Sequence, residues 1–332
     1  MVSSPANKHL VDEISGWLRV FDDGSVDRTW TGAPEALQLM SSVPPHSDPI
    51  DGLSLIDLPG NPTLRFYLPS HLLPNAPILL HFHGGGFCIS HFSWLMYHHF
   101  YANIARSLPA IVVSVQLPLA PEQRLPAAYH VAFQALLRLR DATPPLTSLA
   151  HLTRVFLIGD SSGANIVHEL SVMVGRAEEK EPGFWSPIKV AGGIAIHPGF
   201  VRSTPSPSEM KLEWETPFLT LDMLNKFLAL ALPEGAGKEH PYTCPMGKLA
   251  PPMEGLKLPP MMVVVAEKDL IRDTEMEYCE AMKKAGKEVQ VFFQTDVGHS
   301  FYLNIFAVEE DDVTRKRTQE LILAIKDFVD RH

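Results

Sequence analysis

The chain has 332 residues, of which 45% are hydrophobic and 20% charged. This composition is typical of a globular protein and excludes a disordered or coiled-coil chain. A formal net charge of -10 argues against nucleic acid or an anionic membrane surface as a partner.

Cysteine usage and the N-terminus both favour a cytoplasmic protein. The three cysteines, Cys88, Cys244 and Cys279, are odd in number and far apart, so they predict free thiols and no disulfide framework or zinc site. Residues 1–16 lack the charged start and apolar core of a secretory signal. The apolar runs are no longer than strands, well short of the roughly 20 residues that span a bilayer.

The first 70 residues predict short, irregularly spaced elements. Leu10, Val11 and Ile14 have helical spacing and predict a short helix over 9–16. A strand at 17–21 follows, and Asp23-Gly24 predicts a hairpin turn that returns through 26–30. We expect an irregular surface segment over 32–49. Two further strands are predicted at 53–57 and 64–68.

From residue 77 the chain alternates between buried strands and helices. Strands are predicted at 78–82, 111–115, 155–158, 190–196, 261–266 and 289–293. Helices are predicted at 94–107, 125–140, 164–177, 273–285 and 314–330. This alternation predicts a single α/β domain whose mostly parallel sheet is covered by helices on both faces.

The stretch from Arg202 to Pro260 interrupts the alternation. It is rich in proline and serine at first and then contains an amphipathic helix at 220–232. An insertion of this kind after a core strand is typical of a lid over the strand ends. The alternative is a helix that simply packs on the body of the protein.

One short stretch combines the features of a serine nucleophile. The sequence Gly159-Asp160-Ser161-Ser162-Gly163 lies between a strand pattern and a helix pattern. In that setting Gly-x-Ser-x-Gly forms a nucleophile elbow, and its glycines let strand, turn and helix approach closely. We predict Ser161 as the nucleophile and Asp160 as a structural hydrogen-bonding residue. The alternative is a plain serine-glycine loop.

The run His83-Gly84-Gly85-Gly86-Phe87 leaves the strand predicted at 78–82. A tetrahedral oxyanion needs converging N–H donors, and consecutive glycines let the backbone turn its amides inward. We therefore predict an oxyanion hole at Gly84, Gly85 and Gly86. Gly85 and Gly86 supply the donors, and the Ser162 N–H is the third. A triple glycine by itself is also typical of a flexible turn.

A serine nucleophile needs a base, and five histidines follow Ser161: His168, His197, His240, His299 and His332. In hydrolases with this elbow the order along the chain is serine, acid, histidine. Only His299 lies in a loop between a late core strand and the last helix, so we predict it as the base. His168 and His197 are better explained as packed or surface residues.

Three aspartates compete for the role of the acid that orients His299. Asp269 follows the strand at 261–266, where the carboxylate of a triad belongs. Asp273 falls on the next helix, where its charge favours the helix dipole. Asp296 would point from the same loop as His299. We predict Asp269. No histidine pair, such as His81 and His83, has the carboxylate cluster that would complete a metal site.

Five motifs stand out together, namely residues 83–87, 119–128, 159–165, 269–273 and 298–301. Their combination resembles plant carboxylesterases of the hormone-sensitive-lipase group, and the resemblance covers nearly the whole chain. Residues 15–32 and 212–306 look especially like the hypersensitivity-related plant serine hydrolases.

The resemblance implies an α/β-hydrolase fold with a cap at about residues 1–16 and 203–250. It also implies hydrolysis of small acyl or aryl esters through an acyl-enzyme, with no cofactor. The same family contains gibberellin receptors that lack the catalytic histidine, so His299 favours an enzyme. Dehydratases and cyclases that use threonine as nucleophile are excluded by Ser161, whereas those that keep serine remain an alternative.

Two positions depart from the family pattern. Ala164 stands where many relatives have glycine, which implies slightly different helix packing behind the elbow. The segment 142–154 is shorter than usual, which leaves open the surface near the strand before Ser161. We expect a cytoplasmic serine carboxylesterase, with a small-molecule receptor or a lyase as alternatives.

Overall fold

The computed structural model describes residues 8–72, 75–142, 150–212 and 219–332. Parts of the two expected cap elements, residues 1–7 and 213–218, lie outside this set. Most of the shortened segment at 142–154, residues 143–149, also lies outside it.

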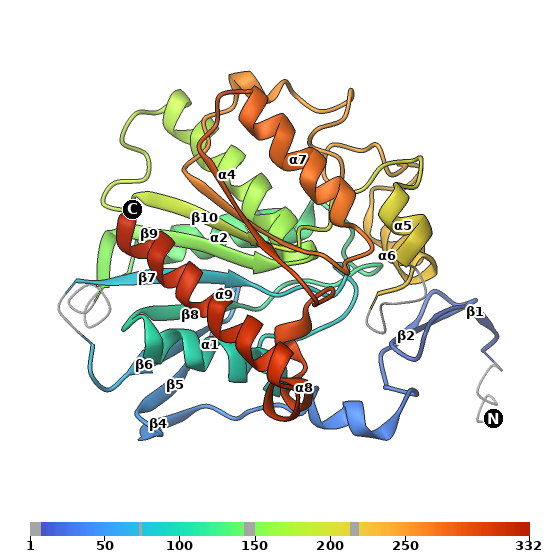
Figure 1. Ribbon diagram of the computed structural model, residues 1–332, viewed down its shortest axis with the longest axis horizontal. Helices are drawn as coiled ribbons and strands as arrows, with labels where there is room; N and C mark the ends of the chain where they lie inside the picture. The colour runs from blue at the N-terminus through green and yellow to red at the C-terminus, as the bar shows by residue number, and fades with distance from the viewer. Residues whose placement is uncertain (1–7, 73–74, 143–149, 213–218) are drawn as a thin grey trace, which may run out of the picture.

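A large sheet of nine strands dominates the described part of the chain (Figure 1). Its strands, in spatial order, are β12 (Val289–Gln294), β11 (Met261–Ala266), β10 (Val190–Ile196), β9 (Ala150–Asp160), β7 (Ala76–Phe82), β8 (Ile111–Val115), β6 (Leu64–Pro69), β5 (Leu53–Leu58) and β4 (His46–Ile50). From β12 to β8 neighbouring strands are parallel, and β6, β5 and β4 continue the sheet antiparallel. The predicted α/β class with a mostly parallel sheet is confirmed.

Helices cover both faces of this sheet, as the alternation predicted. One face carries α2 (Ala127–Arg140), α4 (Ser162–Lys180) and α7 (Arg272–Lys284), and the other carries α1 (Leu95–Ser107) and α9 (Asp312–Arg331). In Figure 1, α9 crosses in front of the sheet. Strand β7 shows why its residues are apolar throughout: Ile78 and Leu80 enter one core, and Leu79 enters the other.

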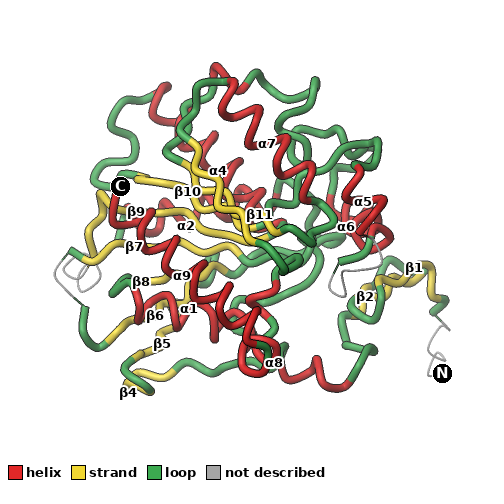
Figure 2. The backbone as a smooth tube through the Cα atoms, viewed as in Figure 1, coloured by secondary structure: helices red, strands yellow, loops and turns green. Residues whose placement is uncertain are grey.

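Shorter elements complete the described residues. They are β1 (Leu10–Ile14), β2 (Leu18–Phe21), β3 (Val26–Asp27), α5 (Pro207–Leu212), α6 (Leu221–Ala231), α8 (Ile305–Glu310), and the 3-10 turns η1 (Pro34–Gln38), η2 (Met253–Gly255) and η3 (Phe301–Leu303). The first three strands form a small antiparallel sheet around the predicted turn at Asp23-Gly24. Figure 2 shows β1 and β2 at the same end of the molecule as α5 and α6.

Two expectations for the N-terminal region are wrong. The segment 9–16 forms strand β1 and not a helix, because pairing with β2 satisfies its backbone and only Ile14 is buried, while Leu10 and Val11 stay exposed. Strand β4 lies within the segment expected to be irregular. Its residues are mostly exposed and pair with β5 only near the two ends, so no apolar alternation marks it.

The strand ends that carry the candidate residues lie along one edge of the sheet. Register pairs Phe82 at the end of β7 with Gly159 on β9, and Ile196 at the end of β10 with Asp160. The loops after β7, β9, β10 and β11 therefore leave the same edge, which is where sites in open α/β sheets form.

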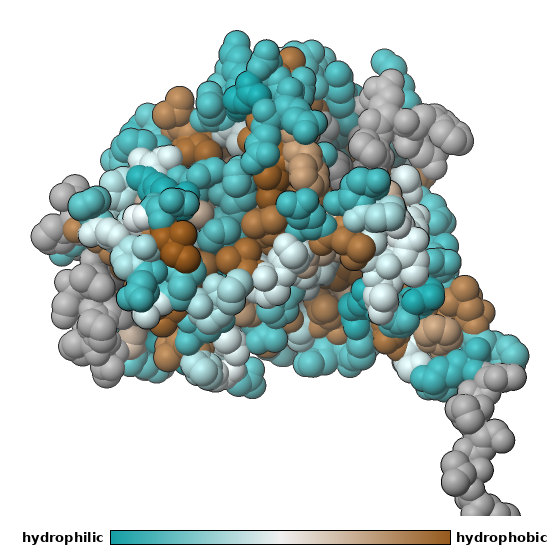
Figure 3. Space-filling model, turned by 90° about the horizontal axis from the view of Figure 1, so that it is seen from below, coloured by the Kyte–Doolittle hydropathy of each residue, from teal (hydrophilic) through white to brown (hydrophobic). Residues whose placement is uncertain are grey.

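The described helices include none with the length and apolar composition that a membrane span requires. On the face seen from below in Figure 3, apolar residues lie among polar ones. Exposed large apolar side chains include Ile50 and Ile56 on the antiparallel strands β4 and β5.

Candidate active site

Ser161 occupies a sharp turn between β9 and α4. Its φ of 51° and ψ of -122° are unusual for a residue with a side chain, and its N–H donates to Ile196 O at 2.9 Å. A Cβ at Gly163 would lie 2.1 Å from Phe82 O, and one at Gly159 would lie 2.4 Å from Gly163 O. Only glycine allows strand and helix to approach this closely.

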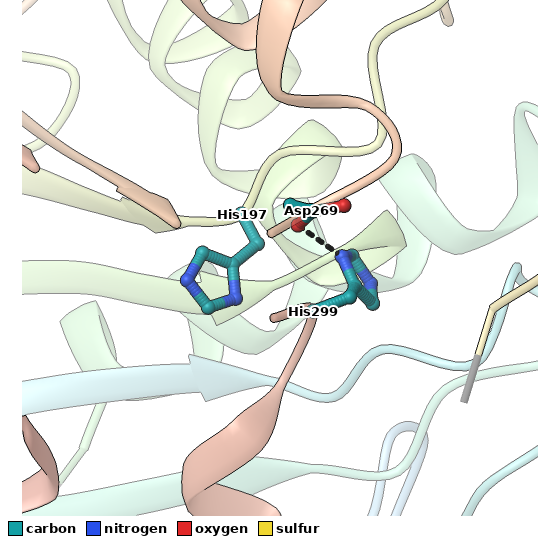
Figure 4. A group of neighbouring side chains, drawn as sticks. All are labelled: His197, Asp269 and His299. Carbon is teal, nitrogen blue, oxygen red and sulfur yellow. Dashed lines mark hydrogen bonds and ion pairs between the residues drawn. The ribbon is translucent and has the colours of Figure 1, made fainter. Parts of the chain in front are cut away.

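Asp269 and His299 form a buried pair (Figure 4). A hydrogen bond of 2.6 Å joins Asp269 Oδ2 and His299 Nδ1, and Asp269 Oδ1 accepts from Ile271 N–H at 3.1 Å. The two residues follow β11 and β12, which are adjacent parallel strands. The carboxylate therefore fixes both the orientation of the imidazole and the nitrogen that carries the proton.

The pair shifts the ionisation of both partners. Burial lowers the pKa of His299, but the charge of Asp269, the hydrogen bond to it and the charge of Asp160 raise it, so the pKa lies above its ordinary value. Burial raises the pKa of Asp269, yet His299 outweighs that effect and holds it below its ordinary value. Each group favours the charged form of the other.

Ser161 and His299 line the same cavity, which has a volume of about 390 Å³. Within the described residues no hydrogen bond joins their side chains. Hydrogen bonds between catalytic groups are often loose before a substrate binds. The structure thus brings Asp269 and His299 together and places Ser161 on the cavity that His299 reaches.

Gly85, Gly86 and Ser162 also line this cavity. Among the described residues, the N–H groups of Gly85 and Gly86 have no hydrogen-bond acceptor, and Ser162 N–H is a free first-turn donor of α4. Gly84 differs, because its N–H donates to Asp160 Oδ1 at 3.2 Å. The inclusion of Gly84 in the oxyanion hole is therefore corrected, since its amide anchors the loop.

Asp160 is a structural hydrogen-bonding residue, as expected. It is 2% exposed and accepts from Gly84 N–H, which ties the strand before Ser161 to the glycine loop after β7. Burial raises the pKa of this carboxyl to about 6, against the lowering effects of His83 and His299.

The rival residues lie elsewhere or have other partners. Asp273, in the first turn of α7, accepts from Ser208 N–H, and Asp296 pairs with Arg317. His168 is buried against Tyr278, with 2.9 Å between Nδ1 and the phenol oxygen. None of these aspartates contacts His299 in the described part of the chain.

His197 has a more specific role than the packed or surface residue expected. It is fully buried at the end of β10, and its Nδ1 accepts the Ser300 N–H at 3.0 Å. Ser300, next to His299, has a left-handed φ of 51°, so this bond holds the loop that presents His299. Burial lowers the pKa of His197 to about 3, which keeps its ring neutral and able to accept. The sequence feature that could have indicated this role is the position of His197 at the carboxyl end of a buried strand.

Donor atoms of His197, Asp269 and His299 lie within 4.8 Å of one another (Figure 4), a spacing that could hold a metal ion. Hydrogen bonds within the protein already use the His299 and His197 Nδ1 atoms, as described above. The group is thus accounted for as an orienting network for His299.

The remaining walls of the cavity are mostly apolar, and two distant segments contribute much of them. The N-terminal segment contributes Trp17 and Trp30, whose rings pack edge to face at 4.5 Å between centroids. Helix α6 and Leu219, which lies two residues before it, contribute five more side chains, namely Leu219, Met223, Leu224, Phe227 and Leu228. The lining residues that the structure describes include no lysine or arginine.

Comparison with known families decides the classification. The profile of the alpha/beta hydrolase fold matches residues 79–303. The chain belongs to the α/β-hydrolase family. Solved structures share the fold: the Francisella virulence factor BioJ has a TM-score of 0.71 at 21% identity, with 86% of this chain and 87% of that chain covered. A Pyrobaculum calidifontis esterase has a TM-score of 0.67 at 25% identity, covering 84% and 86%.

Relatives within the α/β-hydrolase family include plant carboxylesterases, which confirms the resemblance to the hormone-sensitive-lipase group. Probable carboxylesterase 6 of Arabidopsis thaliana is 31% identical, covering 98% of this chain and 95% of its own. A 2-hydroxyisoflavanone dehydratase of Glycyrrhiza echinata is 33% identical over 98% of both chains. A gibberellin receptor of Arabidopsis thaliana is 33% identical over 79% of this chain and 78% of the receptor.

Proposed function

We propose that the protein is a serine carboxylesterase that hydrolyses small, uncharged acyl or aryl esters. The observation that carries the proposal is the buried Asp269–His299 pair, whose imidazole opens on the cavity that Ser161 lines. The apolar walls and the lack of cationic side chains among the described lining residues favour an uncharged ester over a carboxylate. The free cysteines Cys88, Cys244 and Cys279 support a cytoplasmic location.

The reaction follows from the position of each group. His299 Nδ1–H donates to Asp269, so Nε2 is free to take the Ser161 proton as Oγ attacks the ester carbonyl carbon. The resulting oxyanion accepts from the N–H groups of Gly85, Gly86 and Ser162. His299 then gives its proton to the leaving alcohol, and an acyl-enzyme remains on Ser161. Water, activated by His299, releases the acid and restores the serine.

The test is the Ser161→Ala variant assayed with 4-nitrophenyl butyrate. Without its nucleophile, the enzyme should lose at least about 10³-fold in kcat. Ser54→Ala is a matched control, because Ser54 Oγ donates to Ser47 O on an edge strand. Both variants should keep the melting temperature of the wild type, and a fluorophosphonate probe should label Ser161. Turnover by Ser161→Ala at the wild-type rate would contradict the proposal.

A dehydratase is the second candidate, favoured by the plant dehydratase that is 33% identical over 98% of both chains. Such an enzyme would use His299 and the cavity to remove water from a hydroxylated substrate. Incubation with a 2-hydroxyisoflavanone distinguishes the two. The dehydratase would be favoured if the substrate loses one water with both the wild type and Ser161→Ala, and if the wild type does not turn over the ester. Tight binding of a small acid such as a gibberellin, without turnover, would instead indicate a receptor.

A further inference from the structure

The segment from Leu119 to Pro126, part of one of the five motifs, takes no part in the reaction proposed above. It connects β8 to α2 and lies outside the group of residues that line the cavity. Its hydrogen bonds nevertheless reach three separate parts of the site. These are the oxyanion loop (residues 83–89), the N-terminal segment that bears Trp30, and the C-terminal end of α6.

The oxyanion loop needs outside support because its backbone is strained. Gly85, Gly86 and Phe87 have successive φ values of 98°, 58° and 63°. Glycine adopts such angles readily, but a residue with a Cβ such as Phe87 does so only when its surroundings hold it. The N–H groups of the two glycines, which line the cavity, can serve the proposed oxyanion only while this conformation lasts.

Hydrogen bonds to Phe87 and Cys88 hold the conformation. Phe87 N–H donates to Ser162 Oγ at 3.2 Å, and Phe87 O accepts from Ala120 N–H at 2.9 Å. Cys88 O accepts from Arg28 Nε at 2.7 Å. The loop is thus fastened on one side to the helix of the nucleophile and on the other to Arg28 and the Leu119–Pro126 segment.

Arg28 joins these supports through its whole guanidinium group. Besides the bond to Cys88, one terminal nitrogen donates to Ala120 O at 2.8 Å. Two more bonds, of 2.8 and 2.6 Å, form a bidentate pair with Glu122. Such a fork fixes direction as well as distance. Because Arg28 lies two residues before Trp30, it also seats the N-terminal segment over the cavity.

The same segment holds the other wall of the cavity. Arg124 donates to Ala229 O at 2.7 Å and to Leu232 O at 2.8 Å, and Leu125 N–H donates to Ala231 O at 2.8 Å. Carbonyls at the end of a helix lack partners within it, and a cationic side chain there is favourable. Helix α6 is therefore docked by its C-terminus on the segment that also supports the oxyanion loop.

We propose that Arg28 is a positioning residue for the oxyanion hole. Through Cys88 and the Leu119–Pro126 segment it keeps Gly85 and Gly86 in the conformation that stabilises the transition state, and it couples this conformation to the seating of the N-terminal segment. The inference rests on the proposed esterase function, and it assigns a role in the rate of reaction to a residue that does not touch the substrate.

The test compares Arg28→Ala and Arg28→Lys with Arg19→Ala in the full-length protein. Arg19 pairs with Asp27 in the small N-terminal sheet, which makes it a matched control. Loss of one oxyanion donor costs about 10²–10³ in kcat, so a misplaced loop should cost at least about 10-fold with KM within about threefold. Lysine should not restore the rate, because an ammonium group cannot reproduce the paired hydrogen bonds that the guanidinium makes to Glu122.

A transition-state analogue gives a second readout that a merely structural role would not move. Arg28→Ala should weaken inhibition by an alkyl trifluoromethyl ketone by the same factor as kcat/KM, because its adduct carries an oxyanion. Binding of the matching methyl ketone should be unchanged. If Arg28→Ala does not fold, Glu122→Ala replaces it. The expected loss in kcat is then only about threefold, because Arg28 keeps its hydrogen bonds to the carbonyls of Cys88 and Ala120.

Two results separate the possible failures. If Ser161→Ala is inactive while Arg28→Ala, or Glu122→Ala in its place, matches Arg19→Ala in kcat and in trifluoromethyl ketone affinity, the positioning role is overturned and the esterase stands. If Ser161→Ala keeps full turnover, the esterase proposal fails, and with it the reaction that Arg28 would serve.

Discussion

The floor and the roof of the cavity are built in different ways. The floor consists of loops at the edge of the parallel sheet, where strand ends are buried and glycines at 159 and 163 let backbones touch. The roof consists of the N-terminal segment and α6, whose side chains on the cavity are mainly apolar. One polar link between them is Lys226, which donates to Glu13 O at 2.8 Å and remains 31% exposed.

Because of this difference, we expect the floor to determine the rate of the chemical step and the roof to determine which esters bind. Groups on the floor are held within a rigid network, so changes there should affect the chemical step. The roof side chains that line the cavity shape the space for substrate. Changes in these lining side chains, unlike changes at Arg28, should affect KM and the range of accepted esters.

The largest expected effect concerns the floor. Asp269→Asn should lower kcat by about 10³–10⁴-fold, because the amide no longer holds the imidazole in the required tautomer. In the wild type, kcat/KM should fall with acidification through a pKa above the ordinary value of a histidine, since protonated His299 cannot accept the serine proton. In the variant this fall in kcat/KM should occur at lower pH, because burial lowers the pKa of His299 and the raising charge of Asp269 is gone.

Asp273→Asn is the control for that experiment. Asp273 lies four residues along the chain, in the first turn of α7, and accepts from Ser208 N–H. Its replacement should leave the pH profile in place. If kcat/KM of Asp269→Asn fell at the same acidic pH as in the wild type, Asp269 would not set the ionisation of His299.

A smaller but still large effect is expected on stability. In Gly163→Ala the new methyl would collide with Phe82 O, so strand and helix must separate, and the free energy of unfolding should fall by about 3 kcal/mol. Urea titration measures this change. Gly237→Ala is the matched control, because no atom of the described residues lies within 4 Å of a Cβ there. Equal stability of the two variants would mean that a methyl group fits at residue 163 without separating strand and helix.

The smallest effect is expected on the roof. Trp30→Ala removes an aromatic wall of the cavity, so KM for an aryl ester should rise about tenfold while kcat stays within about threefold. Leu37→Ala, at a site 53% exposed in the same segment, is the control and should change neither constant. A fall in kcat as large as that of Asp269→Asn would abolish the distinction between floor and roof.

Much of the floor could be predicted from the sequence because its signals are local. The apolar runs of β7, β9 and β11 each end in the residues that matter, and parallel strands bring their carboxyl ends to one edge whatever the loops between them do. The position of Asp269 directly after the strand at 261–266, with Asp273 on the next helix and Asp296 on the loop of His299 itself, was therefore enough to predict that His299 pairs with Asp269.

Other features depend on contacts between distant segments, and only the tertiary structure decided them. The sequence could not show that Gly84 donates to Asp160, 76 residues away, while the amides of Gly85 and Gly86 have no acceptor among the described residues. The same holds for β1, whose exposed Leu10 and Val11 have helical spacing by coincidence and whose conformation comes from pairing with β2.

The sequence by itself thus determined the layered α/β fold and the residues at the sheet edge, because strand and helix periodicity and the elbow glycines act over a few residues. The tertiary structure decided which amides stay free, that His197 supports the loop of His299, and that Trp17 and Trp30 face α6 across the cavity. These features depend on hydrogen bonds and packing between segments that no local pattern relates.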